Sequence, residues 1–241
     1  MPNYVLLLSY VGTRFHGWQI QPNLRTVQGV LKQSLEKIFG ENIKITGCCR
    51  TDAGVHAKEY VANFYTIKSL DTERLLKAVN SLLPEDIGVK RIWIQEGFNA
   101  RYSVKGKVYI YRILNSHSRD AFLEPFVWRL PHKLNFSDME RASELFLGKK
   151  DFSAFTKRDD EDKNTIIELE EISLSKAEDL IEIRLRARSF LRYMVRRIVG
   201  SLVQLGMGKI NMESIEAYLS RKRHCPYTAK AKGLTLEKVL L

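Results

Sequence analysis

The sequence predicts an α+β fold made of two tandem ferredoxin-like (βαββαβ, RRM-like) halves, fused into one extended, mostly antiparallel sheet. Three observations support this prediction. Strand-like and helix-like segments follow the order βαββαβ in residues 1–103, that order returns in residues 104–241, and the basic stretch 105–107 forms a junction between the two halves. We expect the helices on one face of the sheet and an active-site cleft between the halves.

In the first half, apolar and turn residues define two helices and four strands. Thr26 is placed to cap a helix that Gly40 ends, because apolar residues recur between them at helical spacing. Asp71 is placed to cap a second helix, which Pro84 ends. The four strand-like segments are residues 5–10, 43–48, 59–67 and 88–95.

The second half has similar signals. Ser137 and Glu140 have the spacing of a capping box, which predicts a helix that ends at Gly148. Residues 190–205 read as an apolar helix with several arginines, and Asn211 is placed to cap a short extra helix. The expected strands are residues 108–114, 166–173, 180–188 and 233–240.

Composition and charge restrict the class of protein. Hydrophobic residues make up 44% of the 241 residues, which is enough for a packed core. Lys and Arg outnumber Asp and Glu by 39 to 28, and the net charge of +11 favours nucleic acid as a partner over a membrane surface. The three cysteines form no zinc or disulfide pattern, and no apolar run approaches ~18 residues. We therefore expect a cytoplasmic protein with no membrane span.

The connection formed by residues 49–57 is the first candidate site. Strand connections usually consist of Gly, Asn, Pro and Ser, but this one carries Arg50, Asp52 and His56. An Asp in a loop often only caps the turn through its own backbone, and Asp52 by itself leaves that interpretation open. Asp52 and His56 are too few ligands for a convincing metal site, so chemistry without a metal is the simpler interpretation.

Six arginines and no acid lie within residues 184–197. A solvated charged face usually mixes signs, so this run indicates contact with phosphates. On the predicted helix Arg192 and Arg196 are four residues apart and are expected to share a face. Arg188, Arg192 and Arg197 are the candidate RNA-binding residues.

Tyr109 and Tyr111 are expected on one face of the strand 108–114. A tyrosine on a strand most often packs in the core or against a neighbouring strand. The alternative is a platform for an unstacked base, a contact worth roughly 1–3 kcal/mol per base. The residues alone leave both interpretations open.

Several motifs along nearly the whole chain together resemble a known family. They are Phe15-His16-Gly17-Trp18-Gln19, Arg50-Thr51-Asp52-Ala53-Gly54-Val55-His56-Ala57, Ala100-Arg101 with Tyr109 and Tyr111, Phe190-Leu191-Arg192 with Met194-Val195-Arg196, and Ala231-Lys232-Gly233-Leu234. In this order they are similar to the motifs of the tRNA pseudouridine synthase A family. Two positions depart from the family pattern: Cys49 stands where Gly usually precedes the Arg-Thr-Asp sequence, and Asn99 stands where His is frequent.

The resemblance implies an isomerase that makes pseudouridine at positions 38 to 40 of the tRNA anticodon arm, as a homodimer without metal or organic cofactor. It makes Asp52 the nucleophile, Tyr109 the residue that stacks on the target uracil, and Arg50 and Arg196 the cations around the carboxylate. Asp52 would attack either ribose C1′ or base C6, and the sequence leaves that choice open. Whether the Tyr109 hydroxyl takes part in proton transfer also stays open.

Two other classes of protein compete with this interpretation. A non-catalytic RNA-binding protein with two RRM-like sheets would explain the charge, but it leaves Asp52 without a role. A metal-dependent nuclease would need several acids that converge on the metal.

The loop formed by residues 156–165 contains an acidic run at residues 159–162. Because acids repel phosphates, this run argues against contact between that loop and RNA.

Overall fold

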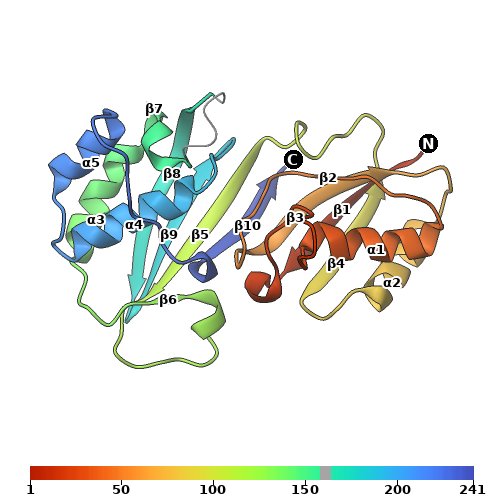
Figure 1. The fold of residues 1–241 in the computed structure, drawn as a ribbon, viewed down its shortest axis with the longest axis horizontal. Helices are drawn as coiled ribbons and strands as arrows, with labels where there is room; N and C mark the ends of the chain where they lie inside the picture. Colours follow the sequence, from red (N-terminus) through yellow and green to blue (C-terminus); the bar gives the residue numbers. More distant parts are fainter. Residues whose placement is uncertain (158–163) are drawn as a thin grey trace. The chain divides into compact units, whose positions relative to one another are not determined.

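The computed structural model describes residues 1–157 and 164–241, which form two compact units (Figure 1). The first unit is Met1–Lys105 together with Leu236–Leu241, and the second is Gly106–Thr235. The acidic run at 159–162 lies outside the described residues. The last six residues were expected in the C-terminal half, but they belong to the first unit, where the Lys105 N–H donates to the Leu240 carbonyl at 2.8 Å.

The first unit has the predicted βαββαβ order. Its elements are β1 (Asn3–Tyr10), α1 (Val27–Phe39), β2 (Ile45–Gly47), β3 (His56–Tyr65), α2 (Thr72–Leu82) and β4 (Ile87–Ile94). The strands lie in the order β4-β1-β3, each pair antiparallel, and β2 pairs with β3 on its other side. Helices α1 and α2 contact each other, as expected for helices on one face of a sheet.

Local signals set both helices of this unit where the sequence predicts them. The Thr26 hydroxyl accepts from the Gly29 N–H at 3.3 Å, and Gly40 ends α1 in the left-handed region at φ 67°. The Asp71 carboxylate accepts from the Arg74 N–H at 2.9 Å and caps α2. β3 begins at His56, three residues before the predicted start, so it leads directly out of the candidate loop.

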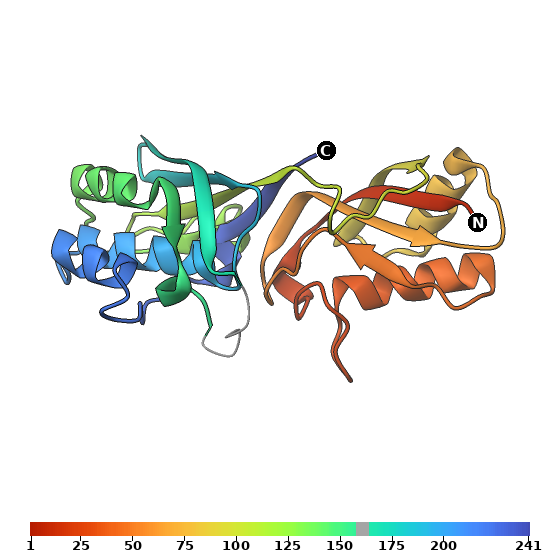
Figure 2. The ribbon, with the colours of Figure 1, turned by 90° about the horizontal axis from the view of Figure 1, so that it is seen from above.

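The second unit is more elaborate than its prediction. Its elements are β5 (Gly106–Leu114), β6 (Trp128–Arg129), α3 (Phe136–Ser143), β7 (Gly148–Asp151), β8 (Ile166–Ala177), β9 (Leu180–Ala187), α4 (Met194–Gly206), α5 (Met212–Leu219) and the start of β10 (Leu234–Leu240), with short 3-10 helices at Glu124–Phe126, Glu144–Phe146, Ser153–Phe155 and Ala231–Gly233. The strands lie in the order β5-β9-β8-β7, each pair antiparallel, and the short β6 runs parallel to β5. Figure 2 shows α3 beside α4, which it contacts.

Two helix starts in this unit differ from the prediction. Asn135, not Ser137, caps α3, because the Asn135 side chain accepts from the Asp138 N–H at 3.2 Å. Helix α4 begins at Met194, not at residue 190, because Tyr193 takes a left-handed conformation at φ 65° that interrupts the chain before it. Arg192 therefore lies outside α4, and the expected helical face shared by Arg192 and Arg196 does not exist.

In the described part of the chain, none of the helices has the length and apolarity that crossing a lipid bilayer requires. Within residues 1–157 and 164–241, no three His, Cys, Asp or Glu side chains lie close enough together to hold a metal ion.

Candidate active site

Asp52 lies on the connection from β2 to β3, here called the Asp52 loop (residues 48–55). Its backbone is held by the segment that follows β1, residues 12–18. The Trp18 N–H donates to the Thr51 carbonyl, and the Gly54 N–H donates to the Phe15 carbonyl, both at 3.2 Å. The Val55 N–H donates to the Asp52 carbonyl at 3.2 Å and closes a turn directly after the carboxylate residue. The Asp52 backbone is therefore fixed on both sides.

Two glycines allow the 12–18 segment to approach the loop this closely. A Cβ atom at Gly12 would lie 2.0 Å from the Val55 carbonyl oxygen. A Cβ atom at Gly17 would lie 2.5 Å from the Thr51 carbonyl oxygen, and Gly17 also has φ 85°, a conformation that favours glycine. The predicted motif Phe15 to Gln19 thus serves to hold the loop that carries Asp52.

Aromatic residues pack against the Asp52 loop and hydrogen-bond to it. Trp18 stacks on Tyr60 with ring centroids 4.1 Å apart, and the Tyr60 hydroxyl donates to the Cys49 carbonyl. The hydroxyls of Tyr10 and Thr51 form a hydrogen bond of 2.8 Å next to Asp52. Burial raises the pKa of both Tyr10 and Tyr60 well above the usual tyrosine value, so both phenols stay neutral. The loop is thus supported without adding an anion beside the carboxylate.

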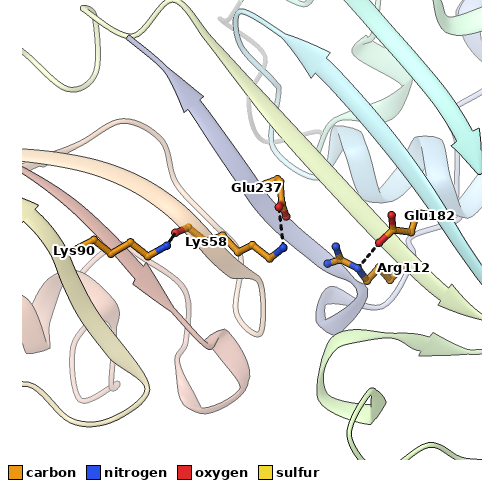
Figure 3. Close-up of polar contacts among 5 residues, drawn as sticks. All are labelled: Lys58, Lys90, Arg112, Glu182 and Glu237. Atoms are coloured by element: carbon orange, nitrogen blue, oxygen red, sulfur yellow. Dashed lines mark hydrogen bonds and ion pairs between the residues drawn. The ribbon is translucent and has the colours of Figure 1, made fainter.

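Exposure separates the two charged candidates on the loop. Thr51 is buried, Asp52 is half-buried, and Arg50 is exposed. The fixed backbone therefore holds Asp52 at a position that is partly open to solvent. Within the same unit, β3 continues from the loop to Lys58, which pairs with Glu237 at 2.8 Å and accepts from the Lys90 ammonium through its carbonyl (Figure 3).

In the second unit, Tyr109 and Tyr111 lie two residues apart on β5. Tyr109 lies opposite Leu185 of β9 and makes a T-shaped contact with the Phe190 ring, with centroids 5.1 Å apart and an interplanar angle of 89°. Tyr111 is completely buried, and its hydroxyl donates to the Lys230 carbonyl at 2.7 Å. Tyr111 is therefore a structural residue, whereas Tyr109 keeps 6% of its surface exposed.

Arg196 lies in the first turn of α4 and is fixed by residues 227–229, here called the closing segment of this unit. Its Nε donates to the Ala229 carbonyl at 2.8 Å, and Gly200 packs against the Tyr227 backbone, with its missing Cβ only 2.8 Å from the Tyr227 carbonyl oxygen. The guanidinium carbons of Arg192 and Arg196 each lie 5.2 Å from the centroid of the Tyr193 ring. Arg192 and Arg196 are therefore close to each other, as the sequence predicted, but they meet at the Tyr193 ring and not on one face of a helix.

The arginines on β9 are neutralised by acids. Arg184 pairs with Glu171 at 2.9 Å, and Arg186 pairs with Glu170 at 2.8 Å. Arg112 of β5 pairs with Glu182 of β9 at 2.6 Å (Figure 3). The run of arginines predicted a cationic surface, but Arg184 and Arg186 pair with acids of the neighbouring strand β8, which the local sequence does not show.

The three predicted RNA-binding arginines have different surroundings. Arg188 and Arg192 are exposed. Arg197 is half-buried; its Nη1 donates to the Thr156 carbonyl and lies 3.3 Å from both ring nitrogens of His224. Arg197 therefore has a clear role in the fold, whereas Arg188 and Arg192 are open to solvent.

The sequence offered His56 only as a possible metal ligand, and the structure gives it a different contact. His56 is buried, and its Nδ1 accepts from the Gly12 N–H at 3.0 Å. The adjacent glycine-rich motif was visible in the sequence, but nothing local indicated that His56 and Gly12, 44 residues apart, would meet.

Known proteins match the whole chain. A family model described as tRNA pseudouridine synthase matches residues 7–103 and 142–240. A protein named tRNA pseudouridine synthase A from Aquifex aeolicus (strain VF5) is 54% identical over 242 residues, which is 100% of each chain. Proteins of the same name are 43% identical in Thermosipho melanesiensis (strain DSM 12029 / CIP 104789 / BI429), over 100% of each chain, and 42% identical in Clostridium botulinum (strain Eklund 17B / Type B), over 99% of each chain.

Among solved structures, a chain of a Cbf5-Nop10-Gar1 complex is 12% identical, with a TM-score of 0.33, over 83% of this chain and 54% of that chain. That similarity is too low to support any conclusion. The full-length identities and the family match lead to one assignment: the chain belongs to the tRNA pseudouridine synthase A family.

Proposed function

We propose that this protein isomerises uridine to pseudouridine at positions 38–40 of the tRNA anticodon stem-loop, with Asp52 as the nucleophile. Family membership makes the protein an isomerase that acts on tRNA. The observation that most supports Asp52 is its loop: the backbone is held on both sides of the residue, while the side chain stays half-buried. A fixed nucleophile loses little conformational entropy when it reacts, and this favours catalysis.

The reaction leaves the composition of the nucleotide unchanged. The bond from ribose C1′ to N1 breaks, the base rotates, C1′ bonds to C5, the C5 proton leaves to water, and N1 takes up a proton. An ionised Asp52 adds to C1′ or to C6 and is released when the new bond is complete. The target uridine must first leave its stack, at a cost of a few kcal/mol.

Other residues are proposed to support that step. Arg50 and Arg196 keep the carboxylate ionised, since a neighbouring guanidinium opposes the effect of desolvation. Tyr109 stacks on the displaced uracil, and the edge contact with Phe190 supports this because it fixes the plane of the ring. Arg188 and Arg192, both exposed, hold the phosphates of the anticodon arm. A homodimer and a cytoplasmic location follow the family pattern and belong to the same proposal.

The experiment that tests the proposal uses tRNA that carries tritium at uridine C5. Each turnover releases one tritium atom to water, so the rate is read directly. We expect Asp52→Asn and Asp52→Ala to abolish release while the affinity for tRNA stays within about threefold, because the carboxylate is needed for chemistry and not for phosphate contact. Asp71→Asn is the matched control, since asparagine also caps a helix such as α2 well.

The same assay separates the competing classes. A non-catalytic RNA-binding protein would retain the tRNA without releasing tritium from any variant, including the wild type. A nuclease would cleave the tRNA and would stop when a chelator is added. Substantial release by Asp52→Ala would refute the nucleophile assignment even if the wild type is an isomerase.

A further inference from the structure

His56 lies at the start of β3, four residues after Asp52 in the sequence, and only 2% of its surface is exposed. Its Nδ1 accepts the N–H of Gly12, the first residue of the 12–18 segment, at 3.0 Å. A neutral imidazole that accepts at Nδ1 carries its proton at Nε2. This hydrogen bond ties the end of β1 to the end of the Asp52 loop.

The backbone segments around this bond are closely packed. A Cβ atom at Gly12 would lie 2.0 Å from the carbonyl oxygen of Val55, the residue before His56. The pairing of β1 with β3 shifts register between Leu8 and Tyr10, just before Tyr10 pairs with Ala57. Between these two pairs β3 has one residue more than β1, so the bulge lies on β3, close to its start at His56.

Gly12 begins the segment whose backbone hydrogen bonds hold the residues on either side of Asp52. From Gly12 the segment continues to Phe15, whose carbonyl accepts from the Gly54 N–H, and to Trp18, whose N–H donates to the Thr51 carbonyl. Both contacts lie within two residues of Asp52. A displacement of Gly12 therefore moves the backbone groups that fix the carboxylate residue.

We infer that His56 is a positioning residue for Asp52, which acts by holding Gly12 and, through it, the 12–18 segment. The inference rests on the proposed role of Asp52 as nucleophile. His56 sets the geometry of attack and does not itself exchange protons with the uridine. Its loss consequently lowers the rate of the chemical step and leaves the affinity for tRNA nearly unchanged.

Three substitutions separate positioning from simple packing. His56→Asn places an amide oxygen close to the position of Nδ1 and keeps an acceptor for Gly12. His56→Gln is one methylene longer and moves its acceptor toward the position of Nε2. His56→Leu has similar bulk and no acceptor. Asn80→Leu is the control, because the Asn80 side chain makes two hydrogen bonds of 2.8 Å to the Val89 backbone in the same unit, away from the Asp52 loop.

The measurements are kcat and KM for tritium release, the Kd for tRNA, and the melting temperature of each variant. We expect His56→Leu and His56→Gln to lower kcat by about 10- to 100-fold with KM and Kd within about twofold of the wild type. His56→Asn should keep kcat within about threefold of the wild type. Asn80→Leu should lower the melting temperature and leave kcat unchanged.

Three results would overturn the inference. The first is a wild-type kcat in a folded His56→Leu or His56→Gln variant. The second is an equal loss of kcat in His56→Asn and His56→Gln, which would show that the acceptor position does not matter; this comparison also decides the question if His56→Leu fails to fold. The third is activity in Asp52→Asn measured in parallel, which would remove the proposed function together with the inference, whereas an inactive Asp52→Asn confines the failure to His56.

Discussion

Arg196 and Ala229 are joined by two hydrogen bonds in opposite directions: the Ala229 N–H donates to the Arg196 carbonyl at 2.9 Å, and the Arg196 Nε donates to the Ala229 carbonyl at 2.8 Å. The closing segment of the second unit thus fixes the Arg196 side chain, which we propose to act beside the Asp52 carboxylate. The Nε edge of the guanidinium therefore serves the fold.

This relationship predicts the effect of Arg196→Ala. We expect turnover to fall by about 100-fold or more and tRNA affinity by less than about fivefold, because a cation beside the nucleophile acts on the chemical step. Arg184→Ala is the matched control, since Arg184 already pairs with Glu171 on the same unit. Tritium release and tRNA binding would be measured across a range of salt concentrations. If added salt reproduced the Arg196→Ala defect in the wild type, Arg196 would be only a phosphate contact.

Tyr109 and Tyr111 provide a second matched pair. Tyr109→Leu removes a ring that we propose to stack on the uracil, so we expect turnover to fall by about 5- to 150-fold. Tyr109→Phe keeps the ring against Phe190 and should retain most of the turnover. Tyr111→Phe loses only the hydrogen bond to the Lys230 carbonyl and should cost about 1 kcal/mol of folding stability without loss of rate. An inactive but folded Tyr109→Phe variant would instead give the Tyr109 hydroxyl a role in proton transfer.

The sequence predicted correctly those helix ends that are set by residues next to them in the chain. Thr26 and Gly40 delimit α1 because a capping hydroxyl and a left-handed glycine act within four residues of the helix ends. The same reasoning failed at α4, because Tyr193 has a left-handed conformation that its own sequence does not favour. A non-glycine residue in that region is set by its tertiary surroundings, which a single sequence does not contain.

The candidate site shows the same division. Asp52 was found from residue types that are unusual in a strand connection, and that signal is local. The role of Gly12 is not local, because the atoms it must avoid belong to Val55, more than 40 residues later. The acids that neutralise Arg184 and Arg186 lie on a neighbouring strand, so counting charges along the sequence overestimated the cationic surface.

Arg25 and Asp86 predict a pH dependence of stability. Two hydrogen bonds from the Arg25 guanidinium, at 2.7 and 2.8 Å, lower the pKa of the Asp86 carboxyl. A carboxyl whose pKa is lower in the folded state stabilises the fold above its unfolded pKa, about 3.9, and loses this contribution as the pH falls through the folded value. We expect Asp86→Asn to reduce the free energy of unfolding by about 1 kcal/mol at pH 7, because the pair is partly exposed.

The difference between Asp86→Asn and the wild type should stay constant from pH 7 to about pH 5 and shrink below about pH 4. Urea unfolding at each pH measures it. Glu171→Gln is the control, because Glu171 and Arg184 are both more exposed and their pair should contribute less than about 0.5 kcal/mol. A difference that grew as the pH fell would contradict the assignment of a lowered pKa to Asp86.

Alanine substitutions at Gly17 and Gly97 distinguish the effect of backbone strain from the effect of close packing against the Asp52 loop. Both have positive φ, 85° and 68°, so alanine is strained at either position by about 1 kcal/mol. A Cβ atom at Gly17 would lie 2.5 Å from the Thr51 carbonyl oxygen, whereas one at Gly97 would meet nothing within 4 Å. Gly17→Ala must therefore push the 12–18 segment away from the loop. We expect it to lower kcat by about tenfold or more, while Gly97→Ala lowers the melting temperature only slightly and keeps the wild-type kcat. Equal kcat values for the two variants at a temperature where both are folded would show that this segment does not position Asp52.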